Sequence, residues 1–252
     1  DLSFSYPQGK ARVLEGLNLS LLANQSLAIL GPNGSGKSTL LNLLLGWLKP
    51  KAGSLLLNGK THAQYSRREL GKAMALVPQN EPVSFEFSAL DFVMFGRAPY
   101  LSPLEAPGEA DYQIGLGALE KVGLAGLEDR SVLAMSGGEK QLLLIARALA
   151  QESQTILLDE PSSHLDLGNK ARMAKLLRDL AAEGHTLILT THEPELALAL
   201  AERTLMLKEG KLLYDGLTPA VINTETLSEL YQSPVEVVNH EGTALIRWDS
   251  LT

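Results

Sequence analysis

Cysteine is absent from the 252-residue chain, which excludes a disulfide framework and a thiolate metal site. No stretch of about 18 residues is uniformly apolar, so we expect no membrane-spanning segment, and we recognise no signal peptide at the N-terminus. Basic residues are in the minority, since 22 Lys and Arg face 29 Asp and Glu and give a net charge of −7. This balance argues against a protein whose main partner is a phosphate backbone, because such proteins usually present a basic face.

The remaining composition is ordinary for a globular protein. An apolar fraction of 45% and a charged fraction of 20% allow a sizeable core. The length fits one large domain or two small ones, and we find no internal repeat, low-complexity segment or long polar linker. The sequence starts at Asp1 without Met, partway through an expected first strand, so we expect an N-terminal trim.

A glycine-rich segment, here called the P-loop (residues 31–39), follows an expected buried strand at 26–30 and precedes an expected helix at 40–45. It matches the phosphate-binding pattern Gly-x-x-x-x-Gly-Lys-[Ser/Thr]. Glycines let backbone N–H groups curl around an anion, and the helix N-terminus adds partial positive charge. We therefore predict nucleotide binding here rather than a flexible glycine turn. The residues expected to contact the nucleotide are Gly31, Pro32, Asn33, Gly34, Ser35, Gly36, Lys37, Ser38 and Thr39.

Side chains at two places suit ATP and Mg²⁺. Lys37 can reach the β- and γ-phosphates, and the Ser38 hydroxyl can ligate Mg²⁺. The apolar strand expected at 155–158 ends in Asp159, which would help to hold the metal, and Glu160, which would polarise the attacking water. Strands often end in acids, but ligands collect at the carboxyl ends of parallel strands, so the pairing with a P-loop strengthens the prediction.

A second glycine-containing loop, here called the signature loop (residues 135–141), precedes a helical run at 142–150. Ser136, Gly137 and Gly138 would form another anion-binding helix N-terminus, although a serine-capped helix is the alternative. One nucleotide does not need two such loops on one chain. We therefore infer that the signature loop binds the γ-phosphate of a nucleotide held by a second copy.

With this loop the chain resembles the ATP-binding cassette (ABC) family, whose signature is commonly Leu-Ser-Gly-Gly-Gln. Met135 replaces the Leu and Glu139 replaces the Gln, which are mild departures because Ser136 and Gly138 are the positions expected to touch phosphate. The resemblance covers essentially the whole chain, with the family's motifs in order and at approximate spacing.

The resemblance implies roles for four further residues. Tyr6 lies where the family stacks an aromatic ring on adenine, and a strand-edge residue is the alternative. Gln79 matches the glutamine that reaches Mg²⁺ and senses the transport partner. Asp166 matches the loop that crosses the dimer interface, with His164 where many members have Ala. His192 matches the histidine that contacts the γ-phosphate, although alone it would be read as an ordinary hydrogen-bonded histidine.

The implied fold is the α/β ABC ATPase fold, in which a P-loop NTPase core with a parallel central sheet carries an antiparallel β subdomain and an inserted helical subdomain. We expect residues 1–252 to form a single ABC ATPase domain. Within it we assign 1–83 and 151–218 to the RecA-like core with the antiparallel layer, 84–150 to the helical signature subdomain and 219–252 to a C-terminal tail.

The individual elements are expected from hydrophobic periodicity and turn residues. Further strands are expected at 2–6, within 13–22, and at 53–58, 74–77, 186–190, 203–208 and 211–214. Further helices are expected at 89–95, 112–122, 170–182 and 193–201.

The implied function is that of the ATP-hydrolysing subunit of an ABC transporter. Two copies would pair head to tail with two ATP molecules between them, each between the P-loop of one chain and the signature loop of the other. Glu160 would act as general base or water-orienting group and His192 would stabilise charge on the γ-phosphoryl, with Lys37 and Gln79 completing the catalytic set. The other implied partners are a membrane permease and, indirectly, an external substrate-binding protein, with no nucleic acid. The implied location is peripheral, at the cytoplasmic face of the inner or plasma membrane.

Two segments bear on the cargo. Residues 92–100 resemble the Gly-Arg-x-Pro segment of ATPases that serve iron–siderophore, haem and cobalamin importers, and residues 227–238 look like the tail of the same group. The alternative is that both are generic, with Arg97 a solvated charge. Importers of molybdate, zinc or manganese are rivals within the family. ABC ATPases of DNA repair or translation form a different class, but they usually carry coiled-coil insertions, zinc modules or two cassettes.

Overall fold

The structure, a computed structural model, describes all residues except 8–11, 83, 241–242 and 249–252. The chain divides into two compact units. Unit 1 comprises Asp1–His62 and Ala181–Thr252, and unit 2 comprises Ala63–Leu180. The chain therefore leaves unit 1 after His62 and returns to it at Ala181.

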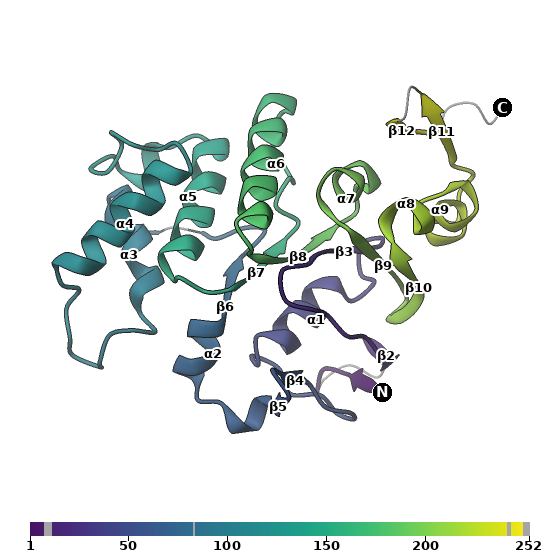
Figure 1. Cartoon of the computed structure of the whole chain (residues 1–252), viewed down its shortest axis with the longest axis horizontal. Helices are drawn as coiled ribbons and strands as arrows, with labels where there is room; N and C mark the ends of the chain where they lie inside the picture. Colours follow the sequence, from purple (N-terminus) through teal and green to yellow (C-terminus); the bar gives the residue numbers. More distant parts are fainter. Residues whose placement is uncertain (8–11, 83, 241–242, 249–252) are drawn as a thin grey trace. The chain divides into compact units, whose positions relative to one another are not determined.

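Unit 1 is built on four hydrogen-bonded strands. The strand β3 (Ser26–Leu30) lies between β8 (Thr186–Thr191) and β9 (Arg203–Lys208) and runs parallel to both, and β10 (Lys211–Leu217) pairs antiparallel with β9 (Figure 1). Every residue of β3 and β8 is buried. A parallel strand covered on both faces needs such a continuous apolar run rather than alternation, which is why these segments read as buried strands.

The other elements of unit 1 are short and lie before, between and after these strands in sequence. Its helices are α1 (Lys37–Leu44), α7 (Pro194–Leu200), α8 (Thr218–Val221) and α9 (Thr224–Tyr231). Its antiparallel pairs are β1 (Leu2–Phe4) with β2 (Leu14–Leu17), β4 (Leu56–Leu57) with β5 (Lys60–Thr61), and β11 (Glu236–His240) with β12 (Thr243–Arg247).

Unit 2 combines a parallel strand pair with helices. The strand β6 (Met74–Val77) runs parallel to β7 (Thr155–Asp159). Three helices pack on one another: α3 (Ala89–Met94), α4 (Glu109–Lys121) and α5 (Gly137–Ala150) (Figure 1). The remaining helices are α2 (Arg67–Ala73) and α6 (Leu167–Ala182), which ends just beyond the unit, and short 3-10 turns lie at His62–Gln64, Phe95–Arg97 and Val132–Ala134.

Serine side chains define where three helices of unit 2 begin. In each, the serine hydroxyl accepts a hydrogen bond from the backbone N–H three residues later, and the acid at that position accepts one from the serine N–H. These reciprocal pairs are Ser66 with Glu69, Ser88 with Asp91, and Ser136 with Glu139.

The α/β fold class is confirmed. The helix α2 was not among the expected elements, and the expected elements differ from the structure at their ends. The strands expected at 2–6, 13–22 and 53–58 shorten to β1, β2 and β4. Three helices begin earlier than expected because side chains cap them. Asp111 accepts a hydrogen bond from the Gly108 N–H at the start of α4, Ser136 caps α5, and Asp166 accepts from the Asn169 N–H in the first turn of α6.

Candidate nucleotide-binding site

The P-loop joins β3 to α1 in unit 1. Gly34 and Gly36 have φ of +79° and +104°, in the left-handed region, and Gly36 is the N-cap of α1. A Cβ atom at Gly31 would lie 2.3 Å from the carbonyl oxygen of Leu207 in β9. Side chains are therefore excluded at these points by backbone conformation or by space, and the loop folds tightly at the N-terminus of α1.

Buried polar groups inside the loop fit an anion. Lys37 is 5% exposed, and its Nζ donates hydrogen bonds to the carbonyl oxygens of Gly31 (2.8 Å) and Pro32 (3.2 Å). Ser35 is also buried, and its hydroxyl has no hydrogen-bond partner within the described part of the chain. A buried hydroxyl without a hydrogen-bond partner is costly, and the Lys37 ammonium places a positive charge in the same loop. The donor set of the loop is therefore suited to a phosphate group.

Tyr6 lies beside the helix that follows the P-loop. Its hydroxyl is 3.2 Å from the Thr39 hydroxyl oxygen in α1, and its ring packs edge-on against Phe4 with centroids 5.0 Å apart. The Tyr6 side chain is nevertheless well exposed, with 42% of its residue surface accessible. The structure thus brings Tyr6 to the P-loop helix with an accessible ring, and a role in stacking on adenine stays a prediction.

His192 directly follows β8, and the P-loop contacts the residue before it. The Gly31 N–H donates a hydrogen bond to the Thr191 carbonyl oxygen at 3.3 Å. His192 itself is exposed. Unit 1 therefore places residues 191–193, here called the histidine loop, next to the first residue of the P-loop.

Gln79, Asp159 and Glu160 come together in unit 2. Asp159 is the last residue of β7 and Glu160 follows it, while Gln79 follows the parallel strand β6. The Gln79 side-chain nitrogen donates to the Glu160 carboxylate at 3.2 Å. Glu160 has φ of +46°, which is uncommon outside glycine, and the Ser163 hydroxyl and N–H both donate to its carbonyl oxygen. Strained backbone of this kind occurs preferentially at functional sites.

The signature loop opens α5, and Glu139 serves the capping role that a glutamine could serve. The Glu139 carboxylate accepts from the Ser136 N–H at 2.8 Å and from Arg130 at 3.0 Å, and Arg130 also donates to the Ala134 carbonyl oxygen. The hydrogen bonds from Ser136, with the charge of Arg130, lower the pKa of Glu139 below its ordinary value. The negative charge that Glu139 adds relative to a glutamine is therefore paired with Arg130, a residue that the family motifs do not include.

Gly138 and Asp166 of the predicted site both lie against Asn169. A Cβ atom at Gly138 would lie 2.7 Å from the Asn169 side chain, whereas one at Gly137 would meet nothing within 4 Å. Asp166 accepts hydrogen bonds from the Asn169 backbone and side chain at 2.8 and 2.9 Å. His164 has φ of +68°. The Asn169 side chain thus lies close to Gly138 of the signature loop and donates to Asp166, a proximity of two segments that no local pattern predicts.

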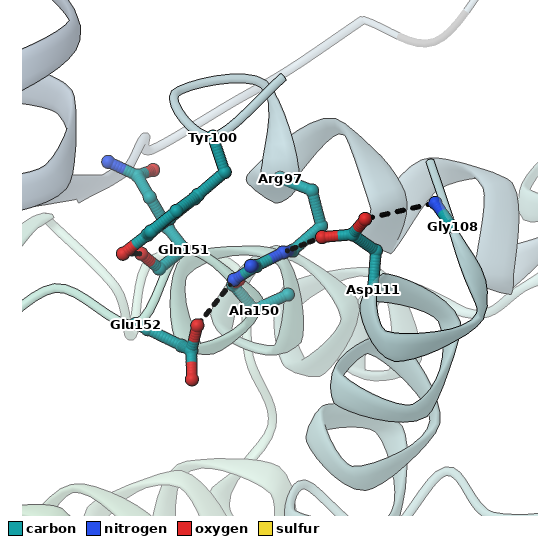
Figure 2. A network of polar contacts seen from close by, with 7 residues as sticks. All are labelled: Arg97, Tyr100, Gly108, Asp111, Ala150, Gln151 and Glu152. Atoms are coloured by element: carbon teal, nitrogen blue, oxygen red, sulfur yellow. Dashed lines mark hydrogen bonds and ion pairs between the residues drawn. The ribbon is translucent and has the colours of Figure 1, made fainter. Parts of the chain in front are cut away.

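Arg97 is buried, so its reading as a solvated charge is wrong. It is 5% exposed, and its guanidinium donates to Asp111 (2.8 Å), Glu152 (2.6 Å) and the Ala150 carbonyl oxygen (2.8 Å), with its Cζ 4.1 Å from the centre of the Tyr100 ring (Figure 2). Burial alone would lower the pKa of Arg97, but the two carboxylates outweigh it and raise that pKa. The Gly-Arg-x-Pro segment is therefore fastened to the C-terminal end of α5.

The described ranges contain neither a metal-binding cluster nor a membrane-spanning helix. No group of three or more His, Cys, Asp or Glu side chains is arranged to hold a metal ion there. Among the helices of the same residues, none has the length and apolar character to cross a membrane.

The comparisons with known proteins agree on one family. The family model described as ABC transporter matches residues 14–163. The chain is 37% identical to the hemin import ATP-binding protein HmuV of Nocardia farcinica, over 92% of this chain and 80% of that protein. It is 35% identical to an iron chelatin transport ATP-binding protein of Helicobacter pylori (98% and 96% covered) and 38% identical to the molybdate import ATP-binding protein MolC of Haemophilus influenzae (93% and 87%).

Solved structures are similar over nearly the same span. An inward-facing metal-chelate type ABC transporter aligns with a TM-score of 0.85 and 35% identity, covering 98% of this chain and 93% of that one. An ATP-binding cassette solved as a dimer in a post-hydrolysis state, with ADP and phosphate, aligns with a TM-score of 0.75 and 27% identity, covering 86% and 96%.

Proposed function

The chain belongs to the ABC transporter family as an ATP-binding ATPase subunit, and from this we propose that it drives import of a metal chelate. The chelate class comprises iron–siderophores, haem and cobalamin. The observation that carries the cargo proposal is the similarity, over 98% of the chain, to a metal-chelate type transporter. Relatives named for hemin and iron chelatin transport support it. Molybdate is the second candidate, because MolC is 38% identical over a similar span.

The proposed chemistry is hydrolysis of Mg²⁺–ATP. ATP supplies the phosphoryl group and Mg²⁺ offsets the charge of its oxygens, so the protein acts by positioning and electrostatics. In this proposal Lys37 holds the β- and γ-phosphates, and Ser38, Gln79 and Asp159 hold the metal. The buried Lys37 ammonium and the unsatisfied Ser35 hydroxyl support the first assignment.

Glu160 orients or deprotonates the attacking water in this proposal, and His192 stabilises charge on the transferred group. The Glu160 carboxylate is held by Gln79 on one side, and its backbone is held in a left-handed conformation by Ser163. A carboxylate fixed in this way can orient water without first losing rotamer freedom. Tyr6 stacks on the adenine ring.

We also propose that two copies pair head to tail. Ser136, Gly137 and Gly138 of one chain then face the nucleotide held by the P-loop of the other, and Asp166 lies near the interface. The related cassette that was solved as a dimer with ADP and phosphate supports this arrangement. The assembly would further include permease subunits and, indirectly, an external substrate-binding protein, with the ATPase peripheral at the cytoplasmic face and no nucleic acid bound.

Glu160→Gln and Lys37→Ala test the catalytic assignment. We expect Glu160→Gln to bind ATP, accumulate as a dimer in size-exclusion chromatography, and hydrolyse ATP about 10²–10⁴-fold more slowly, as loss of a general base implies. Lys37→Ala should lose both ATP binding and turnover. Glu120→Gln, on an exposed position of α4, is the matched control and should behave as the wild type. Normal hydrolysis by Glu160→Gln would overturn the assignment.

A pull-down from solubilised native membranes tests the transport assignment. A multi-spanning permease with a substrate-binding protein is the expected result, and the ligand of the captured binding protein separates metal chelates from molybdate. Recovery of only soluble, nucleic-acid-associated partners would contradict the proposal and favour an ABC ATPase of DNA repair or translation.

A further inference from the structure

A side chain of the C-terminal segment reaches the histidine loop. The Tyr231 hydroxyl donates a hydrogen bond to the backbone carbonyl oxygen of His192 at 2.8 Å. Tyr231 is the last residue of α9, and His192 directly follows β8, so the contact joins two elements that are 39 residues apart in sequence. We propose that Tyr231 is a positioning residue that holds His192 in place for ATP hydrolysis. This inference rests on the role proposed above for His192.

The helix that carries Tyr231 is firmly attached to the strands of unit 1. Leu227 and Leu230 of α9 are fully buried, at 0% and 1% exposed. In the last turn, the Glu229 carbonyl oxygen accepts from the Lys208 ammonium of β9, and the Glu229 carboxylate accepts from the Tyr214 hydroxyl of β10, both at 2.5 Å. Because β9 pairs directly with the P-loop strand β3, the end of α9 is fixed relative to the P-loop.

The histidine loop is held from its other side by the P-loop and by its own turn. Thr191 is buried, its carbonyl oxygen accepts from the Gly31 N–H, and its hydroxyl accepts from the Glu193 N–H at 2.9 Å. The His192 backbone is therefore held at two points. The P-loop bonds the carbonyl of the preceding residue, Thr191, and the Tyr231 hydroxyl bonds the carbonyl of His192 itself. An imidazole that must meet a transferring phosphoryl group tolerates little displacement, since about 1 Å of misplacement can cost on the order of 10²-fold in rate.

The hydrogen bond from Tyr231 can be removed by deleting its hydroxyl group alone. In Tyr231→Phe the ring stays and the hydroxyl is lost, and we expect kcat for ATP to fall roughly three- to tenfold, as loss of one hydrogen bond implies. KM for ATP should be unchanged, because the P-loop contacts are intact. In the nucleotide-free state, amide hydrogen exchange at residues 191–193 should be faster in Tyr231→Phe than in the wild type. This measurement reports on the loop without any turnover.

Tyr214→Phe is the matched control, because it removes a tyrosine hydroxyl that also anchors the last turn of α9 but does not contact the histidine loop. It should leave kcat and the exchange of residues 191–193 at wild-type values. If both variants lower kcat and loop protection equally, the effect comes from loosening α9 and the positioning role is refuted. If Tyr231→Phe matches the wild type in both measurements, the role is refuted directly.

A double-mutant cycle with His192→Ala separates this inference from the function on which it rests. If Tyr231 acts through His192, Tyr231→Phe should cause no further loss of turnover in the His192→Ala background. A full additional loss in that background would overturn the inference while leaving the ATPase proposal intact. Wild-type turnover by His192→Ala alone would instead refute the proposed role of His192.

Discussion

Arg97→Ala tests how much the network of Figure 2 stabilises unit 2. The substitution leaves Asp111, Glu152 and the Ala150 carbonyl oxygen without their shared donor. Removing one partner of a buried ion pair typically costs about 3–5 kcal/mol. The Glu152 side chain is 50% exposed, so water can replace the guanidinium there, and the cost should fall near the lower end, about 3 kcal/mol. For a chain of this size that corresponds to a melting temperature lower by about 6–12 °C.

Thermal and urea unfolding followed by circular dichroism measure this loss. Lys175→Ala is the control, because Lys175 forms an exposed i,i+4 pair with Asp179 and its side chain is 73% accessible. The control should change the free energy of unfolding by no more than about 0.5 kcal/mol. If Arg97→Ala were as mild as the control, the network would contribute nothing to stability, and the reasoning from burial would be refuted.

Two further predictions concern α4 and the 3-10 turn at Phe95–Arg97. The hydrogen bond from Arg97, with the one from the Gly108 N–H, holds the pKa of Asp111 below its ordinary value of 3.8. The ionised Asp111 carboxylate therefore stabilises the folded state above that pH, and this stabilisation is lost as the pH falls through the folded-state pKa. The difference in urea midpoint between the wild type and Asp111→Asn should therefore shrink below about pH 4, and a pH-independent difference would contradict this. Gly117→Ala, where a Cβ atom would meet nothing within 4 Å, should raise stability in urea unfolding by about 0.5–1 kcal/mol, whereas Gly96→Ala, where Cβ would lie 2.3 Å from the Arg147 carbonyl oxygen, should lower it.

The parts of the site that local sequence encodes were predictable. The P-loop pattern predicts a strand before it and a helix after it; the structure has β3 at the expected residues 26–30 and begins α1 at Lys37, three residues earlier than expected. The Asp159–Glu160 pair could be placed at a strand end because β7 is continuously apolar. Motif order then supplied Gln79, and the structure brings it to Glu160.

The parts that depend on distant residues were not predictable from one sequence. Arg97 looks like a surface charge until Glu152, 55 positions away, is brought beside it. The hydrogen bond between Tyr231 and His192 spans 39 positions and has no pattern. The start of α6 was missed for a different reason, since Asp166 caps it through a side-chain hydrogen bond that hydrophobic periodicity does not register.

The position of β3 between β8 and β9 has a consequence for how the protein is made. Ser26 pairs with Leu187 and Leu27 with Arg203, so the strand that leads into the P-loop is synthesised long before either neighbour. Long-range parallel pairing of this kind is slow to form and cannot precede synthesis of its partners. The strands β6 and β7 of unit 2 are both complete earlier in translation. A nascent chain that has not yet reached Lys208 contains every residue of the P-loop but lacks the complete strand β9 that pairs with β3. We therefore expect the P-loop to become able to bind phosphate only late in translation.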